Sequence, residues 1–178
     1  MVVEKMEQIA SMDREARTYA FLESLGISYD RVAHAPAETM EDCIRIEKEL
    51  GAPICKNLFL CNRQGTVFYL LMMPGDKPFK TKELSAQIGS ARLSFASAER
   101  MLALLDILPG AVSVMGLMND RNCEVNLLVD EDLLQNEYVG CHPCVNTASL
   151  KLKTCDVFEH FLPAVAHGWK TVCLKGME

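Results

Sequence analysis

Residues 57–72 read NLFLCNRQGTVFYLLM, and this stretch decides the fold class of the chain. Two apolar, aromatic-rich runs flank a turn cluster, Asn62 to Gly65, and this pattern predicts a β-hairpin. Neither run alternates cleanly between apolar and polar residues, so we expect both faces of the hairpin to be covered. The hairpin is therefore predicted to lie in a sheet that is buried on two sides.

The segments around the hairpin predict further helices and strands. Apolar spacing and capping residues favour helices over residues 4–25, 40–50, 81–88, 97–105 and 154–165. Strands are expected over residues 27–34, 123–129, 149–153 and 172–174. This order is not the regular strand–helix alternation of a parallel sheet. We therefore predict an α+β fold, with a mixed, mostly antiparallel and barrel-like sheet surrounded by helices.

Length and composition limit the number of domains and the class of protein. A chain of 178 residues, 49% of them hydrophobic, fits one domain over residues 1–178, with residues 1–26 supplying its N-terminal helix. The sequence has no long apolar run and no secretory signal pattern at its start, and its eight cysteines are too few for a disulfide scaffold. We expect a reduced, cytoplasmic protein without a membrane span. The net charge of −6 argues against a general nucleic-acid coat.

The CxxC pair Cys141–Cys144 encloses His142 and leaves three interpretations open. A structural zinc site needs four ligands, usually from two such pairs, and the sequence has no second CxxC. A redox pair would stand at the start of a helix after a strand, whereas Pro143 and Asn146 favour a loop. The third interpretation is that the two cysteines are incidental and flank a useful histidine.

Three other features could carry chemistry. Lys56 at the head of the hairpin either keeps its ammonium in water or donates to a phosphate or carbonyl oxygen. Gly110 either belongs to an ordinary Pro-Gly turn or lets backbone N–H groups face a developing oxyanion. Lys77, Lys80 and Lys82 form a compact basic cluster that could meet a phosphate backbone or be a solvated face.

Taken in order, several segments resemble one family. They are Lys56-Asn57-Leu58-Phe59-Leu60, Leu93 to Glu99, Leu108 to Asp120, Val129-Asp130 and His142 to Thr147. This ordered set resembles the YbaK-type aminoacyl-tRNA deacylases, and most of all the free-standing prolyl-tRNA editing proteins of the PrdX or ProXp-ala kind. The resemblance covers about residues 27–174.

The resemblance implies a fold and an activity. It implies the barrel-like mixed fold, without metal or cofactor. It also implies hydrolysis, in trans, of the ester that joins a wrong amino acid to its tRNA, with Ala-tRNA(Pro) as the expected substrate. The implied partner is mischarged tRNA rather than DNA or a membrane, and the chain would be a monomer or a homodimer. The alternative is a non-catalytic tRNA- or ligand-binding protein, with a regulatory role, of the same fold.

The resemblance also implies roles for individual residues. The implied catalytic residues are Lys56, Gly110 and His142, and the implied substrate-binding residues are Asn57, Val114 and Asn146. Val114 stands where the family has a proline, so loop rigidity and pocket width could differ. A tRNA-binding patch is expected at Lys77, Lys80, Lys82 and Arg92. We expect the Lys56 ammonium and the Gly110 amide to converge on a hollow that is sized for alanine.

Overall fold

The computed structural model describes residue 9 and residues 13–176. The helices are α2 (Arg14–Ser24), α3 (Met40–Leu50), α4 (Thr81–Ile88), α5 (Ala98–Leu105), α6 (Thr154–Asp156) and α7 (Leu162–Ala164), with the 3₁₀ helices η1 (Val114–Asn119) and η2 (Glu131–Gln135) and the π-helical turn η3 (Val157–Phe161). The strands are β1 (Asp30–Ala33), β2 (Cys55–Cys61), β3 (Phe68–Pro74), β4 (Ser94–Phe95), β5 (Val125–Asp130), β6 (Tyr138–Cys141), β7 (Ala148–Lys153) and β8 (Trp169–Val172).

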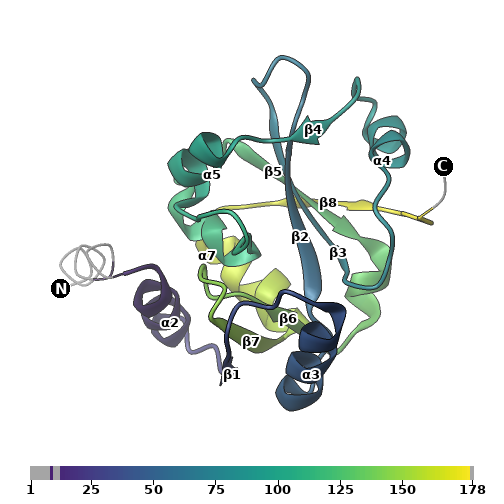
Figure 1. Cartoon of the computed structure of the whole chain (residues 1–178). Coiled ribbons are helices and arrows are strands. Elements are labelled where there is room, and N and C mark those ends of the chain that lie inside the picture. Colours follow the sequence, from purple (N-terminus) through teal and green to yellow (C-terminus); the bar gives the residue numbers. More distant parts are fainter. Residues whose placement is uncertain (1–8, 10–12, 177–178) are drawn as a thin grey trace.

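The strands of the described residues form two sheets (Figure 1). The larger sheet has the order β4-β2-β3-β5-β8, and the smaller has the order β1-β7-β6. Every pair is antiparallel except β3–β5 and β5–β8, which are parallel. The predicted α+β fold with a mostly antiparallel sheet is confirmed.

The barrel-like closure is not found, because the two sheets stay separate. They meet at one isolated bridge between Ile54 and Gly140, where the Gly140 N–H also donates to the Pro53 carbonyl at 2.8 Å. A Cβ at Gly140 would lie 2.9 Å from that carbonyl oxygen, so the close approach of the two chains depends on glycine.

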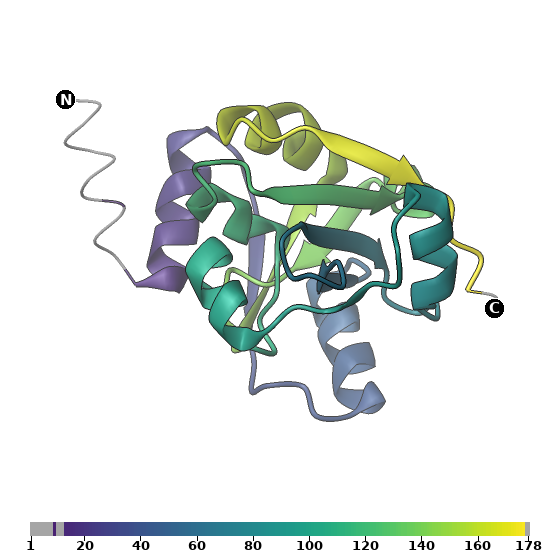
Figure 2. The same cartoon turned by 90° about the horizontal axis from the view of Figure 1, so that it is seen from above.

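The β2–β3 hairpin is covered on both faces, as the sequence predicts. On one face, Phe59 and Met72 pack with Leu150 of the small sheet in a core that fills the space between the sheets. On the other face, Leu71 packs with Leu84 of α4 in a smaller second core. Alternate residues of β2 therefore face different cores. In both views α4 and α5 lie on opposite sides of β2 (Figures 1 and 2).

The predicted helix over residues 40–50 is confirmed with its signals. Thr39 accepts from the Asp42 N–H, and the Asp42 side chain accepts in return from the Thr39 N–H, which completes a capping box. Gly51 ends the helix at a φ of 72°. The helices predicted over residues 81–88 and 97–105 are found as α4 and α5, with Ser97 capping α5.

Some boundaries differ from the sequence predictions. The first helix is described from Arg14, after its cap Asp13, and residues 4–8 and 10–12 of the predicted helix lie outside the described residues. The predicted helix over residues 154–165 contains a π-helical turn ahead of Pro163. The last strand lies at 169–172 rather than 172–174, and β6 is a strand that the sequence analysis did not predict.

Within residues 9 and 13–176, no helix is both long enough and apolar enough to cross a lipid bilayer.

Candidate active site

A cleft of about 380 Å³ runs along the edge of β2. Its walls come from β2, from the segment that joins β4 to α5, from the loop at Pro109 and Gly110, and from His142 after β6. Four stretches that are distant in the sequence therefore meet here, and each of them belongs to a motif that the sequence singles out.

The cleft exists because the partner strand of β2 is very short. β4 pairs only with Leu60 and Cys61, and one further bond joins the Ala96 N–H to the Phe59 carbonyl at 3.0 Å. Among the described strands, none pairs with this edge of β2 between the Ile54 bridge and Phe59. In a strand, alternate residues turn their N–H and C=O groups to the same edge. Because the Phe59 carbonyl faces this edge, the backbone groups of Asn57 face it too, and there they border the cleft.

Asn57 brings an unmet hydrogen-bond acceptor to the cleft. Its Nδ2 donates to the Cys55 sulfur at 3.2 Å, whereas its Oδ1 is buried and has no partner among the described residues. A buried acceptor without a partner costs about 1–3 kcal/mol. A ligand that donates a hydrogen bond here would recover that cost.

Gly110 forms the opposite wall at a φ of 92°, in the left-handed region that glycine tolerates. A Cβ here would lie 3.5 Å from Nδ2 of Asn146, so Asn146 stands directly against Gly110. Asn146 itself does not line the cleft. The structure thus brings Gly110 and Asn146 together.

His142 presents a lone pair to the cleft. Its Nδ1 lies 2.9 Å from the Ala148 carbonyl oxygen, which can only accept, so Nδ1 carries the proton. Nε2 is then the unprotonated nitrogen, and no described residue hydrogen-bonds to it. Burial lowers the pKa of His142 from its ordinary 6.5, and nearby His34 lowers it further, although the bond to Ala148 opposes both. At pH 7 the ring is therefore neutral and Nε2 can accept a proton.

Lys56 does not reach this cleft. Its neighbours in β2 alternate between the two cores, and Lys56 lies opposite Met73 of the second core, on the other face from Asn57. Its ammonium donates to the Lys77 carbonyl at 2.6 Å. The expectation that the Lys56 ammonium and the Gly110 amide converge in one hollow is therefore wrong for this structure. Asn57, its neighbour, lines the same cleft as Gly110.

Val114 also lies away from the cleft. It is fully buried at the start of η1 and packs in the core between the sheets. Val114 is therefore a core residue and not part of the cleft wall.

The predicted tRNA-binding cations do not form one surface. The Lys77 ammonium donates to Asp130 at 2.6 Å, to Asp132 at 2.7 Å and to the Leu174 carbonyl at 2.8 Å. Burial alone would lower the pKa of Lys77, but the bonds to the two carboxylates outweigh it and raise the pKa. All three N–H groups of Lys77 are used inside the protein, which leaves none for a phosphate. Lys82 and Arg92 border a separate hollow beside α4, and Lys80 precedes the first residue of that helix.

Cys141 and Cys144 are both buried. Burial raises the pKa of Cys141 well above its ordinary value and raises that of Cys144 to about 11. Both thiols are protonated at pH 7, whereas metal binding and disulfide exchange require thiolates. Within the described part of the chain, no group of three or more His, Cys, Asp or Glu side chains is placed to hold a metal ion.

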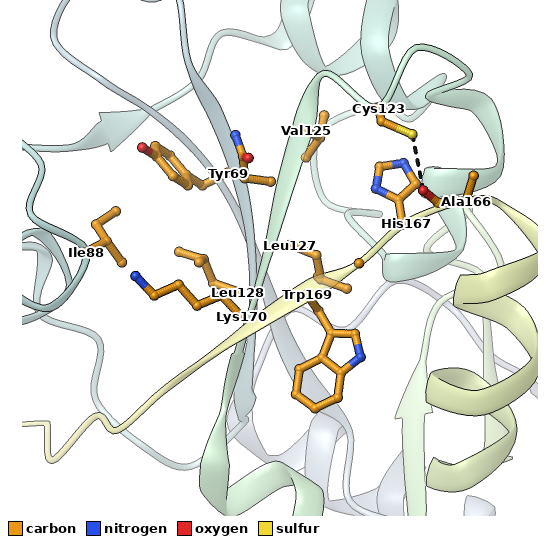
Figure 3. A pocket seen from close by; sticks show the side chains of 12 residues that line it. Tyr69, Ile88, Cys123, Val125, Leu127, Leu128, Ala166, His167, Trp169 and Lys170 are labelled. Atoms are coloured by element: carbon orange, nitrogen blue, oxygen red, sulfur yellow. Dashed lines mark hydrogen bonds between the residues drawn. The ribbon is translucent and has the colours of Figure 1, made fainter.

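A second hollow, of about 340 Å³, lies between β5 and β8 (Figure 3). His167 borders it, and its Nε2 lies 3.3 Å from both the carboxylate and the carbonyl oxygen of Asp120. Cys123 donates to the Ala166 carbonyl at 3.4 Å. The histidine and the cysteine of this hollow are thus both engaged by the protein itself.

The model of the aminoacyl-tRNA editing domain matches residues 34–159 of this chain. The chain belongs to the aminoacyl-tRNA editing domain family. It is 35% identical to the prolyl-tRNA editing protein ProX of Acetoanaerobium sticklandii, over 90% of this chain and 98% of that protein. It is 27% identical to the prolyl-tRNA synthetase associated domain-containing protein 1 of Danio rerio, over 89% of this chain and 86% of that protein.

The fold has counterparts among solved structures. One, described as a candidate trans-editing enzyme for prolyl tRNA synthetase, superposes with a TM-score of 0.68 at 20% identity and covers 93% of this chain and 99% of its own. At that identity the likeness shows a shared fold.

Proposed function

We propose that this chain is an aminoacyl-tRNA deacylase that hydrolyses the ester of mischarged tRNA in trans, with Ala-tRNA(Pro) as its substrate. Family membership and the name of the ProX relative support the reaction class. The observation that carries the proposal is the cleft at the open edge of β2, where Asn57 Oδ1 and His142 Nε2 lack partners among the described residues and Gly110 stands opposite.

Each polar group has a role in ester hydrolysis. His142 Nε2 accepts a proton from water, directly or through the neighbouring ribose hydroxyl, as the water oxygen adds to the ester carbonyl. The Gly110 N–H donates to the carbonyl oxygen as negative charge develops on it. When the ester C–O bond breaks, the ribose oxygen takes the proton back from His142. Asn57 Oδ1 accepts from the α-ammonium of the amino acid and holds it in place.

The reaction needs no covalent intermediate on the protein. The cleft holds one thiol, that of Cys55, and burial raises its pKa to about 11. At pH 7 this thiol is neutral and a poor nucleophile. Water is therefore the attacking group.

Selection follows from the walls of the cleft. Phe59, Met101 and Val112 supply apolar surface around a volume of about 380 Å³ that also has to take part of the ribose. An alanyl methyl group fits beside these side chains, whereas a prolyl ring meets them. Exclusion by size is how an editing site rejects the larger, correct amino acid.

Lys56 and the surface cations have supporting roles in this proposal. The Lys56 ammonium would leave the Lys77 carbonyl and bind the ribose–phosphate end from the other face of β2. The proposal keeps three of the predicted tRNA contacts, namely Lys80, Lys82 and Arg92. It excludes Lys77, whose ammonium is bound inside the protein. If Lys56→Ala leaves the deacylation rate unchanged, Lys56 has no such role. If charge reversal at both Lys82 and Arg92 leaves KM unchanged, these two residues do not bind tRNA.

The test of the function is a deacylation assay with purified protein on Ala-tRNA(Pro) and Pro-tRNA(Pro). We expect the alanyl ester to be cleaved at least about tenfold faster, because the cleft excludes the larger ring. Equal cleavage would overturn size exclusion. No hydrolysis of any charged tRNA, together with tRNA binding, would replace the enzyme with a non-catalytic tRNA-binding protein of the same fold.

A further inference from the structure

Phe95 is a large apolar side chain that stays exposed at the rim of the cleft. Its side chain is 65% exposed, although it belongs to β4 and lines the same cleft as Asn57 and His142. A single exposed apolar residue needs no explanation, but one at the mouth of the proposed active-site cleft lies where a bound substrate could cover it. The segment Leu93 to Glu99 is also a motif that the proposed chemistry leaves without a role.

The ring is held in place. Phe95 pairs with Leu60 in the sheet, and the next residue is tied by the bond from Ala96 N–H to the Phe59 carbonyl. Phe79 meets the Phe95 ring edge-on, with the ring centroids 6.3 Å apart and the planes at 69°. A ring that is fixed by backbone pairing and one edge contact, yet mostly exposed, loses little conformational entropy when a flat ligand covers it.

The position of the ring fits one part of the substrate. Residues that pair directly in an antiparallel sheet project to the same face, so Phe95 lies on the face of Leu60, and hence on that of Leu58 and Lys56. Asn57 projects to the other face. The cleft is lined by both Leu58 and Asn57, so it passes around the open edge of β2. The step along β2 from Asn57 to Leu60 is about 10 Å, a span that a nucleoside and its ester can bridge.

We propose that Phe95 is the platform on which the terminal adenine of the tRNA stacks while its ester lies beside Asn57 and His142. This proposal rests on the proposed function. Unpaired bases at RNA ends are commonly bound by stacking on aromatic side chains. The base then covers Phe95, the ribose crosses the edge of β2, and Lys56 lies on the face from which the phosphate approaches. The competing occupant of this surface is an apolar side chain of a partner protein. In that case, removal of the terminal base from the substrate would not change the effect of Phe95.

The test pairs two substrates with a set of variants. One substrate is a short RNA helix with an alanyl ester on its terminal adenosine, and the other is the same RNA with no base on the terminal ribose. The variants are Phe95→Ala, Phe95→Trp, and Leu102→Ala as the matched control. Leu102 is 42% exposed on the adjacent helix α5 but does not line the cleft.

We expect Phe95→Ala to lower kcat/KM about tenfold on the adenosine substrate and to change it less than about twofold on the base-free one. Phe95→Trp should keep the wild-type rate, and Leu102→Ala should match wild type on both substrates. An equal loss on both substrates, or a loss on neither, would overturn the platform. Failure of the wild-type protein to cleave either ester would instead reject the proposed function itself.

Discussion

Two hollows of similar size border the larger sheet, and they differ in whether their histidine has a partner for Nε2 within the protein. In the hollow between β5 and β8, His167 is bound to Asp120. Cys123 donates to the Ala166 carbonyl there (Figure 3). In the cleft along β2, Oδ1 of Asn57 and Nε2 of His142 have no partner among the described residues. Both places hold histidine and cysteine, so residue type alone does not tell them apart.

The difference lies in how each sheet edge is covered. β5 is paired on both sides, by β3 and β8, and the neighbouring His167 and Cys123 have partners within the protein. On its other edge, β2 pairs with β4 only at Leu60 and Cys61. Beyond this short pairing, one polar atom each of Asn57 and His142 has no partner among the described residues. Buried polar groups without partners are rare and costly, and they concentrate where a ligand supplies the missing bond. The contrast supports the proposal that the β2 cleft is the reaction site.

Substitution of His142 should have the largest effect on activity. We expect His142→Ala to lower kcat/KM for Ala-tRNA(Pro) at least about 100-fold, because it removes the proton acceptor for water. The matched change in the other hollow is His167→Asn. It should lower the free energy of unfolding by about 1–3 kcal/mol through the weakened contact with Asp120, and leave kcat within about twofold. Loss of kcat in the folded His167→Asn protein would contradict the contrast.

Asn57 should separate activity from stability. Asn57→Leu removes the contact with the α-ammonium, so kcat/KM should fall about 10- to 100-fold. The same change removes a buried acceptor that has no partner among the described residues. The free energy of unfolding should therefore stay equal or rise, as urea denaturation would show. A protein that loses stability and activity together would mean that Asn57 is structural.

The pH dependence follows from the direction of the His142 pKa. Burial disfavours the imidazolium, so the pKa lies below 6.5 and the ring is neutral at pH 7. As the pH falls, Nε2 takes up a proton and can no longer accept one from water. We expect kcat/KM to show no histidine titration above pH 6.5. Below pH 6.5, kcat/KM should decrease with falling pH, and the slope should reach about tenfold per pH unit. A titration of kcat/KM with its midpoint above pH 6.5 would contradict the lowered pKa of His142.

Gly110 should lose activity through its backbone. Gly110→Ala places a side chain at a φ of 92°, and relief of this backbone strain should shift the N–H that is proposed to bind the ester. We expect kcat to fall about tenfold. Gly65→Ala is the control, since it has a φ of 66° in the β2–β3 turn with open space around it. Both variants should lose roughly 1 kcal/mol of stability from the strained φ, and only the first should lose rate.

Local signals in the sequence were enough for much of the fold. The hairpin, the capping box at Thr39 and Asp42 and the stop at Gly51 depend on neighbouring residues, and all are found. The failures depend on distant contacts. β6 has only four residues, with Gly140 placed against Pro53, and nothing local marks it as a strand. Whether two sheets close into a barrel depends on pairing across the whole chain.

The same division applies to the site. Asn57, Gly110 and His142 could be picked from ordered motifs, and the structure brings them to one cleft. The face of β2 to which the Lys56 side chain projects could not be predicted, because a shift of one residue in a strand moves a side chain to the other face. Lys77 stood out as a surface cation, yet Asp130 and Asp132, which bind it, are more than fifty residues away. Phe95 was present in a quoted motif, but its exposure is visible only in the fold.

One measurement compares the two hollows directly. A non-hydrolysable analogue of 3′-alanyl-adenosine, with an amide in place of the ester, is titrated into ¹⁵N-labelled protein while amide chemical shifts are followed. The account predicts saturable shifts of the Asn57 side-chain amide and the Gly110 backbone amide, with Cys123 and Gly168 unchanged. Shifts confined to Cys123 and Gly168, with Asn57 and Gly110 silent, would contradict it.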